Sequence, residues 1–434
     1  MPACLEKEGQ LFASEANLHE SLKVISSNQA GKAGHWWDYS RFKSEKVRVL
    51  VVSLRHLLLS EIKGALDRLG HPAQVMLIPG EELDRDKVER LYIETIKQFK
   101  PDFLLTINHL GFDREGVVTH LLESLRVPIA SWYVDSPYLI LGHYRGNTSP
   151  MLTLFMWDRD YVPMLEGLGL ERVIYLPLGV DEEIFNPGAV LTGKPAQQQI
   201  GVGFVGNSMV IKSKSKLKKS GAAGPLLERY QEVCKAFIGS PHLVVRDLMR
   251  ESFPELNRQL LAMGEARALD YETSVIWQTT GWYRKMLLEG LQRFHPTVAG
   301  DPGWSEILGK GFRILRELNY YADLPVFYRS TKVNFNASSR QMKNGLNQRV
   351  FDVPASRSLL LTDFTRQLED MFEPGKEVLA YRSGAEIPGL VEKALKDTGY
   401  RENIARAGYK RALSEHTYAR RLTKLIDVMR ANYA

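Results

Sequence analysis

The segment from Asn334 to Phe364 places a cluster of polar residues between two apolar runs that are typical of buried strands. It reads NFNASSRQMKNGLNQRVFDVPASRSLLLTDF, and its middle part holds Asn344, Gly345 and Asn347. Loops that follow parallel strands lie at the carboxyl edge of a sheet, where α/β proteins bind their ligands. The pattern therefore predicts a ligand-binding loop in this segment.

Arg349 and Asp352 follow this loop, where the chain is predicted to start a helix. The planar guanidinium fork of an arginine suits a phosphate, and a carboxylate at a helix start can accept hydrogen bonds from two ribose hydroxyls. The alternatives are a salt bridge within the domain for Arg349 and a charge–dipole interaction for Asp352. The density of polar groups in the segment favours the binding interpretation.

A second candidate is the turn Gly206-Asn207-Ser208, which ends the apolar run GVGFV. A turn of small residues lets backbone N–H groups approach a phosphate, in particular where a helix begins. A tight turn without a ligand is the alternative. Five lysines follow between positions 212 and 219; they could assist a diphosphate, although such a run is more typical of a solvated loop.

Three further candidates come after apolar runs in the first half of the chain. The segment TINHLGFD contains His109 and Asp113, and the segment WYVDSPY contains Asp135. A histidine has a pKa near neutrality and can act as a base, and an aspartate can act as a base or bind a hydroxyl. The alternative for both segments is a structural turn stabilised by Asn or Asp.

Apolar runs and helical patterns alternate along both halves of the chain. In the first half we expect strands at 47–54, 73–79, 101–108, 127–134, 152–158 and 172–178, with helices at 60–71, 86–100 and 114–126. In the second half we expect strands at 199–208, 296–304, 332–338 and 358–364, with helices at 224–238, 241–263, 266–295 and 388–396. This alternation predicts βαβ units and parallel sheets, so the fold class is α/β with two Rossmann-like halves.

The same pattern divides the chain into five parts. These are an N-terminal extension (1–45), a first Rossmann-like domain (46–180), a linker (181–198), a second Rossmann-like domain (199–412) and a C-terminal helix that packs back toward the first domain (413–434). A chain of 434 residues is too long for one ordinary core, which agrees with two domains.

Composition narrows the class of protein. The chain has two cysteines and no CxxC metal motif, which predicts a reducing compartment. We see no signal peptide and no apolar run of the roughly 20 residues that cross a bilayer, so we expect a cytoplasmic protein. The formal net charge of +6 could favour anionic partners, but the basic residues are not interleaved with aromatic ones, and we expect no nucleic acid partner.

These segments, in this order, resemble the GT-B glycosyltransferases, and in particular the CgeB-like (spore-maturation protein-like) family. PDFLLTINHLGFD and PIASWYVDSPY are similar to its N-terminal domain, and GVGFVGNS, MFEPGKEVLAYRS and RENIARAGYKRALSEHTYARR to its C-terminal domain. LPLGVDEEIFNP resembles the interdomain crossover of many retaining GT-B enzymes. The resemblance covers roughly residues 47–430.

The resemblance implies two Rossmann-like domains that face each other across a cleft. The C-terminal domain would bind a nucleotide-sugar, and the N-terminal domain an acceptor on a protein or glycan. The reaction would need no metal and no cofactor, because helix dipoles and basic side chains stabilise the departing nucleoside diphosphate. The implied donor-binding residues are Gly206, Asn207, Ser208, Asp301, Asn344, Gly345, Asn347, Arg349 and Asp352. The implied catalytic candidates are His109, Asp113 and Asp135.

One position departs from the family pattern. Many retaining GT-B enzymes carry two glutamates with seven residues between them, and the corresponding residues here are Asn344 and Asp352. Asp352 can still hold a ribose, but Asn344 offers a sugar only a neutral hydrogen bond. The retaining mechanism therefore does not carry over directly.

Three functions stay open at this level. The first is transfer of a sugar from a nucleoside-diphosphate donor to a hydroxyl acceptor. The second is a GT-B-like sugar-nucleotide epimerase or hydrolase, and the third is a non-catalytic nucleotide-sugar-binding protein. Arg420, Arg421 and Lys424 on the last helix could touch anionic lipid, so a weak peripheral membrane contact also stays open.

Overall fold

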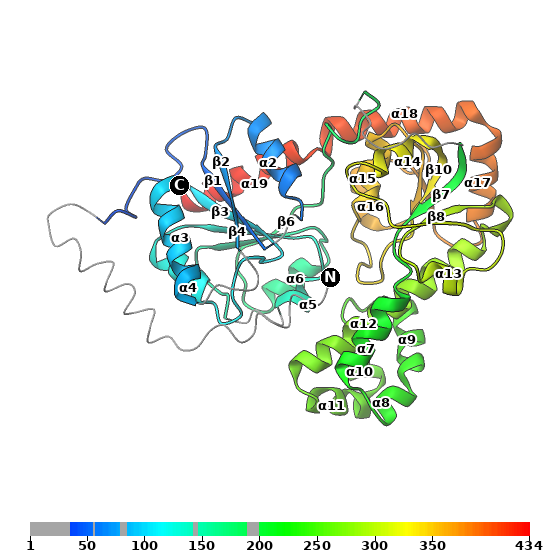
Figure 1. Ribbon diagram of the computed structural model, residues 1–434, viewed down its shortest axis with the longest axis horizontal. Coiled ribbons are helices and arrows are strands. Elements are labelled where there is room, and N and C mark those ends of the chain that lie inside the picture. Colours follow the sequence, from blue (N-terminus) through cyan, green and yellow to red (C-terminus); the bar gives the residue numbers. More distant parts are fainter. Residues whose placement is uncertain (1–34, 55–56, 79–84, 142–145, 189–198) are drawn as a thin grey trace. The chain divides into compact units, whose positions relative to one another are not determined.

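The computed structural model describes residues 35–54, 57–78, 85–141, 146–188 and 199–434, and most of the expected N-terminal extension and half of the expected linker lie outside them. The chain forms two compact units. The first contains the residues up to Trp157, Tyr161–Leu176 and Tyr418–Ala434, and the second contains Asp158–Asp160 and Pro177–Thr417. Each unit has one parallel sheet of six strands. Figure 1 shows one sheet in each unit.

The sheet of the first unit has the order β2-β1-β3-β4-β5-β6. Its strands are β1 (Val49–Ser53), β2 (Ala73–Leu77), β3 (Phe103–Ile107), β4 (Ile129–Tyr133), β5 (Leu152–Met156) and β6 (Val173–Tyr175). Every residue of β1, β3, β4 and β5 is buried, as expected for parallel strands that are covered on both faces. Chain connections run in opposite directions from β1, so the carboxyl ends of β1 and β3 form the switch point of this sheet.

The helices of the first unit include one from the far end of the chain. They are α2 (Leu59–Arg68), α3 (Arg85–Phe99), α4 (Val117–Ser124), α5 (Pro137–Leu141), α6 (Tyr161–Glu166) and α19 (Tyr418–Tyr433). The buried side chains of Tyr418, Leu422 and Leu425 on α19 belong to the same apolar cluster as Val49 and Phe103 of the sheet. The last helix is therefore part of the core of this unit.

The sheet of the second unit has the order β12-β11-β10-β7-β8-β9. Its strands are β7 (Ile200–Val205), β8 (Thr297–Ala299), β9 (Arg313–Leu315), β10 (Thr331–Phe335), β11 (Leu360–Asp363) and β12 (Leu379–Tyr381). The chain runs outward from β7 to β9, returns to β10 beside β7, and continues outward on the other side. The switch point, where doubly wound folds bind their ligands, thus lies at the carboxyl ends of β7 and β10.

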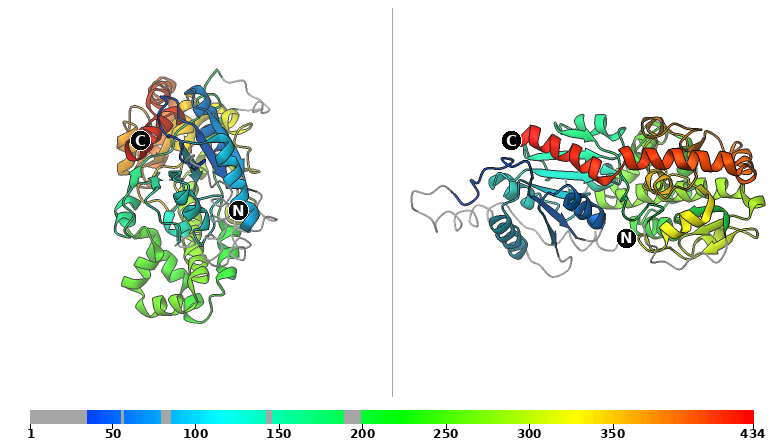
Figure 2. Two further views of the ribbon diagram at one scale, coloured as in Figure 1. Left: turned by 90° about the vertical axis from the view of Figure 1, so that its left-hand side faces the viewer. Right: turned by 90° about the horizontal axis from the view of Figure 1, so that it is seen from above.

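Six α-helices, followed by the short 3-10 helix η2 (Gln292–Phe294), connect β7 to β8 in place of the single helix of a simple βαβ unit. They are α7 (Val210–Ser220), α8 (Pro225–Glu228), α9 (Tyr230–Gly239), α10 (Val245–Ser252), α11 (Pro254–Ala262) and α12 (Glu265–Glu289). We call α7 to α11 with the first half of α12 the helical lobe. Both Figure 1 and the left view of Figure 2 show these helices grouped beside the sheet of their unit.

The helical lobe corrects three expectations. The single helix expected at 224–238 is the short helix α8 followed by α9, and the two meet at Arg229. The lysine-rich stretch, for which a solvated loop was the favoured interpretation, forms α7, because Ser213 and Ser220 are buried while the lysines point outward or form ion pairs. The single helix expected at 241–263 is two helices, since Pro254 starts α11 directly after α10 ends.

The remaining helices of the second unit flank its sheet. They are η2 (Gln292–Phe294), α13 (Trp304–Ile307), α14 (Leu324–Ser330), α15 (Arg349–Ala355), α16 (Arg366–Met371), α17 (Ile387–Lys396) and α18 (Thr398–Glu415). Strands β9 and β12, of three residues each, were not expected from the sequence. In the described part of the chain, no helix has the length and apolar character to cross a membrane.

Candidate functional site

The turn after β7 lies at the switch point of the second unit. The Oγ of Ser208 donates a hydrogen bond of 2.5 Å to Oδ1 of Asp301, which follows β8, and accepts one of 3.2 Å from the N–H of Val210. The carbonyl of Gly206 accepts a hydrogen bond of 2.7 Å from the indole of Trp304. These contacts fix the turn and start α7, so the predicted residues Gly206, Ser208 and Asp301 form one cluster.

The turn after β10 lies beside it. Asn336 is fully buried; its amide donates to Oγ1 of Thr362, and its Oδ1 accepts hydrogen bonds from Nε of Arg349 at 2.7 Å and from Asn347 at 3.2 Å. Ser338 donates from its N–H and its Oγ to Asp363, which ends β11. Asn347 and Arg349 are therefore held at the carboxyl edge of the sheet, where the sequence places them.

Arg284 on α12 connects the two turns. Its Nη1 donates a hydrogen bond of 2.7 Å to the carbonyl of Asn207, and its Nε donates one of 3.3 Å to the carbonyl of Ala337. Its side chain is almost fully buried, with 4% exposed. Burial and the nearby guanidinium of Arg349 lower the pKa of Arg284 to about 9, so it is charged at neutral pH.

Arg284 and Arg349 are suited to bind an anion. Among the described residues, neither guanidinium forms a salt bridge, and Nη2 of Arg284 and both terminal nitrogens of Arg349 donate no hydrogen bond. Asp301 and Asp363 favour the charged form of Arg284, while Ser208 donates a hydrogen bond to Asp301 and Ser338 donates to Asp363. Burial also lowers the pKa of Arg349. The largely buried Arg284 and the partly buried Arg349 therefore keep donors at solvent-accessible positions, where a phosphate or diphosphate can accept hydrogen bonds from them.

Asp352 lies in the first turn of α15 and is fully buried. Its Oδ2 accepts a hydrogen bond of 3.0 Å from Tyr320, and its Oδ1 accepts one of 2.8 Å from Gln348. Gln348 also donates to the carbonyl of Gly179. The structure thus shows Asp352 as the anchor of a hydrogen-bond network, and the ribose-binding role stays a prediction.

Asn344 and Gly345 contact the segment Asp158–Asp160, which belongs to the second unit. The amide of Asn344 donates a hydrogen bond of 2.5 Å to Asp160, and the N–H of Gly345 donates one of 3.2 Å to Asp158. A Cβ at Gly345 would lie 2.6 Å from Asp158, so only glycine fits there. Burial raises the pKa of Asp158 to about 6.

The three catalytic candidates of the first unit have different environments. His109 is fully buried, its Nδ1 lies 2.7 Å from Oγ of Ser131, and burial lowers its pKa to about 3, so it is neutral. Asp113 is buried and accepts hydrogen bonds of 2.8 and 2.7 Å from the N–H groups of Val117 and Val118 at the start of α4. Asp135 alone of the three is exposed to solvent.

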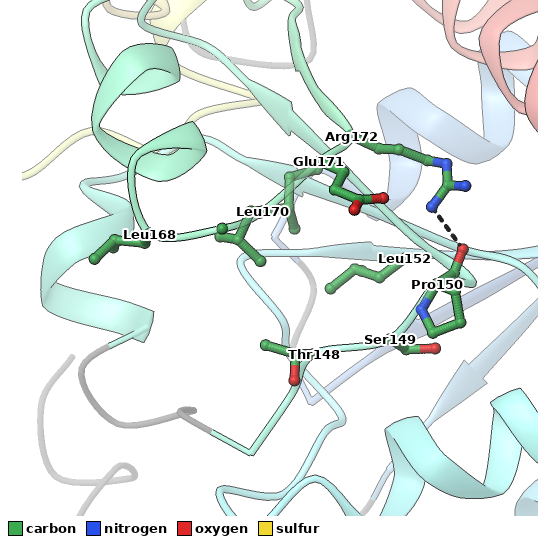
Figure 3. A pocket seen from close by; sticks show the side chains of 10 residues that line it. Thr148, Ser149, Pro150, Leu152, Leu168, Leu170, Glu171 and Arg172 are labelled. Atoms are coloured by element: carbon green, nitrogen blue, oxygen red, sulfur yellow. Dashed lines mark hydrogen bonds between the residues drawn. The ribbon is translucent and has the colours of Figure 1, made fainter.

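A pocket of about 350 Å³ lies elsewhere in the first unit, as Figure 3 shows. Leu152, Leu168, Leu170 and Arg172 line it, and Arg172 donates a hydrogen bond of 2.8 Å to the carbonyl of Pro150. These residues precede β5 and β6 or begin β5, so the pocket lies at the amino edge of the sheet. It is therefore separate from Asp135, which follows a strand at the carboxyl edge.

The described residues contain no group of three or more His, Cys, Asp or Glu side chains that could hold a metal ion. Metal-independent catalysis stays a prediction, because the bound substrate could itself bring a cation.

Sequence reasoning missed Arg284, Asn336, Ser338 and Asp363. The last three follow or end strands in the structure, so the rule that led to Asn207 also applies to them. Arg284 carries a weaker signal: it lies four residues from Thr280 and from Leu288 on the buried stripe of α12, where a charged residue is unexpected.

Comparison with known proteins agrees with this architecture. Residues 283–427 match the family described as Glycosyl transferase-like, a segment that includes Arg284, Arg349 and the loop between them. This match covers about a third of the chain. A comparison with curated proteins found no match.

Two solved structures show the same fold at low sequence identity. The glycosyltransferase from Rickettsia africae is 10% identical with a TM-score of 0.52, over 90% of this chain and 99% of its own. HepE from Anabaena, solved with UDP-glucose, is 10% identical with a TM-score of 0.50, over 89% of this chain and 100% of its own. The two parallel six-stranded sheets and this likeness confirm the GT-B fold class.

Proposed function

We propose that this protein is a glycosyltransferase that moves a sugar from a nucleoside-diphosphate donor to a hydroxyl acceptor. The observation that supports this most is the pair Arg284 and Arg349, whose unused donors lie beside the turns after β7 and β10. The segment that matches the Glycosyl transferase-like family contains both arginines. The CgeB-like relationship and an acceptor on a protein or glycan are part of the same proposal.

In this proposal the second unit holds the donor. Arg284 and Arg349 neutralise the diphosphate, and the backbone of Gly206, Asn207 and Ser208 lies against it. As the bond between the anomeric carbon and the diphosphate oxygen breaks, the electron pair leaves with the nucleoside diphosphate, and the two fixed cations stabilise that charge. HepE was solved with UDP-glucose, so uridine diphosphate sugars are the first donors to test.

Calorimetric titration of nucleoside diphosphates into wild type and Arg349→Ala tests the donor site. The loss of a charge-assisted contact worth about 1.5–3 kcal/mol should weaken binding roughly 10- to 100-fold. Arg293→Ala is the matched control, because Arg293 is exposed on the same unit and pairs with Glu392. The proposal is wrong if no nucleoside diphosphate binds wild type, and the Arg349 assignment is wrong if the variant binds as tightly as wild type.

A binding protein without transfer activity is the second candidate. The observation that favours it is Asn344, which stands where many retaining enzymes have a glutamate and donates its amide hydrogen bond to Asp160. Incubation of the protein with a donor that it binds, with and without candidate acceptors, separates the two. Release of nucleoside diphosphate that depends on the acceptor supports transfer, and binding without release in any mixture supports the second candidate.

A further inference from the structure

The exposed carboxylate of Asp135 is held by a buried side chain of the neighbouring strand. Asn108, which is 8% exposed, donates a hydrogen bond of 2.9 Å from Nδ2 to Oδ2 of Asp135. Its Oδ1 accepts a hydrogen bond of 2.9 Å from the N–H of Val134. One amide thus fixes both the backbone before Asp135 and the carboxylate itself.

The backbone that presents Asn108 is in an uncommon conformation. Asn108 and His109 both have positive φ angles, 53° and 59°, directly after β3. Left-handed conformations at residues other than glycine are costly, and they concentrate where function requires a fixed geometry. The N–H of Asn108 donates to the carbonyl of Trp132 at 3.0 Å, and Oγ1 of Thr106 donates to the carbonyl of Leu110 at 2.7 Å, so both sides of the turn are fixed.

The chemistry of this position requires an amide. The site needs one acceptor for Val134 and one donor for Asp135, and an asparagine supplies both from a side chain that also tolerates a left-handed backbone. An aspartate in its place could accept from Val134 but would face Asp135 with a like charge. Because β3 also borders the switch point of the first sheet, Asp135 lies at the edge where this unit would meet a ligand.

We propose that Asn108 is a positioning residue that orients the Asp135 carboxylate to take the proton from the acceptor hydroxyl. This inference rests on the proposed transferase function. The acceptor O–H bond breaks, its proton moves to Asp135, and the acceptor oxygen forms the bond to the anomeric carbon. The bond from that carbon to the diphosphate breaks, and the electron pair leaves with the nucleoside diphosphate. The proton is released from Asp135 after the product leaves.

Steady-state kinetics of four variants test the inference. Asn108→Ala and Asn108→Gly remove the amide, and glycine does so without backbone strain; both should lower kcat on the order of 10- to 100-fold with the donor KM unchanged. Asp135→Asn should lower kcat at least as much. Asn108→Asp should move the acidic limb of the kcat/KM profile roughly one pH unit higher, because a like charge raises the pKa of Asp135.

Asn147→Asp is the matched control for the charge change. Asn147 is a buried asparagine of the same unit whose side chain donates to the carbonyl of Asp113 and accepts from the hydroxyl of Thr119. This variant should keep the wild-type pH profile even where its stability falls. An unshifted acidic limb in Asn108→Asp overturns the inference, and so does wild-type kcat in Asn108→Gly.

Two measurements keep this test separate from that of the donor site. Titration of nucleoside diphosphates should give wild-type affinity for every Asn108 variant, because Arg284 and Arg349 are in the other unit. If the wild-type protein binds no nucleoside diphosphate, the proposed function fails rather than the role of Asn108. If turnover is too low to measure, carbon NMR titration of the Asp135 carboxyl in wild type and Asn108→Asp replaces the kinetic profile. An equal pKa in the two proteins overturns the inference.

Discussion

Arg284 is a residue whose position costs stability unless a ligand is present. It is a cation with 4% exposed surface beside a second cation, Arg349, and no carboxylate forms a salt bridge with either among the described residues. Such a charge is stabilised by the two carbonyl groups that it contacts and by whatever anion occupies its remaining N–H groups. These two carbonyl groups belong to the turns after β7 and β10, so Arg284 connects the two turns at the carboxyl edge of the sheet.

We expect Arg284→Lys to weaken nucleoside diphosphate binding about 10-fold or more, since lysine keeps the charge but cannot bridge two carbonyls with a planar fork. The ligand-dependent rise in the unfolding temperature should shrink with the affinity. Lys285→Ala is the control, because Lys285 is the next residue of α12 and pairs with Glu289 at the surface. Equal affinities of Arg284→Lys and wild type would contradict this role.

His109 should make the first unit sensitive to acid. Its pKa is about 3 in the folded chain and 6.5 in the reference state, so the unfolded chain binds one more proton between these pH values. Stability from the neutral imidazole is therefore present above pH 6.5 and is lost as the pH falls toward 3, at up to about 1.4 kcal/mol per pH unit.

Denaturant unfolding of wild type and His109→Asn between pH 4 and 7 measures this effect. The asparagine tolerates the positive φ angle, so the variant should unfold with less dependence on pH than wild type. His120→Asn is the control, since His120 is an exposed histidine of the same unit. Parallel pH dependences of wild type and His109→Asn would show that the pKa of His109 does not differ between the folded and the unfolded chain.

At the scale of elements, α12 joins the helical lobe to the candidate donor site. Its first half packs in the lobe, and its second half supplies Arg284 and Thr280, whose Oγ1 accepts a hydrogen bond of 2.9 Å from the N–H of Arg340. Gly281 of the same helix lies against the turn after β7, where a Cβ would stand 2.5 Å from the carbonyl oxygen of Ser208. The turn after β7 is therefore in direct contact with α12.

We expect Gly281→Ala to destabilise the second unit by about 1–3 kcal/mol and to weaken nucleoside diphosphate binding, because the added methyl group forces helix and turn apart. Gly239→Ala is the matched control: Gly239 ends α9 in the same lobe, and a Cβ there meets nothing within 4 Å. That variant should be neutral or slightly more stable. Thermal unfolding with and without a nucleoside diphosphate checks both variants. Unchanged affinity in Gly281→Ala would show that the packing of α12 against the turn does not affect binding.

At the scale of the whole molecule, the chain builds two units but completes the first only with its last helix. Tyr418, Leu422 and Leu425 of α19 are buried in the core of the first unit, more than two hundred residues beyond the rest of it. The first unit can therefore reach its full stability only after the entire chain is available. The second unit is continuous in sequence apart from Asp158–Asp160.

Leu425→Ala should destabilise the first unit by about 2–5 kcal/mol, since it removes a fully buried side chain from a packed core. Asp427→Ala, on the exposed face of the same helix, should change stability by less than about 0.5 kcal/mol. Scanning calorimetry with and without a nucleoside diphosphate assigns the transitions. The transition that responds to the ligand should keep its wild-type temperature in Leu425→Ala. If it falls as far as the transition of the first unit, the two units unfold together.

Local patterns in the chain were enough for the fold class and for the edge of the sheet at which ligands are expected. Continuous β-branched runs such as VRVLVVSL suit only strands that are covered on both faces, and polar residues directly after such runs must lie at the carboxyl edge. Asn207, Asn347 and Arg349 are predicted in this way, and their binding roles stay predictions. Asn336 follows a strand only because β10 ends at Phe335, three residues before the expected end of that strand.

The alternation of strands and helices by itself determined two α/β halves and the loops that carry their polar residues, because burial on both faces and the carboxyl edge follow from local sequence. Only the tertiary structure decided which of those residues are exposed. It buried His109 and Asp113 as parts of the scaffold and left Asp135 open to solvent. It also brought Arg284 to the switch point from the middle of a helix, since that position depends on strand order and helix packing, which no local pattern encodes.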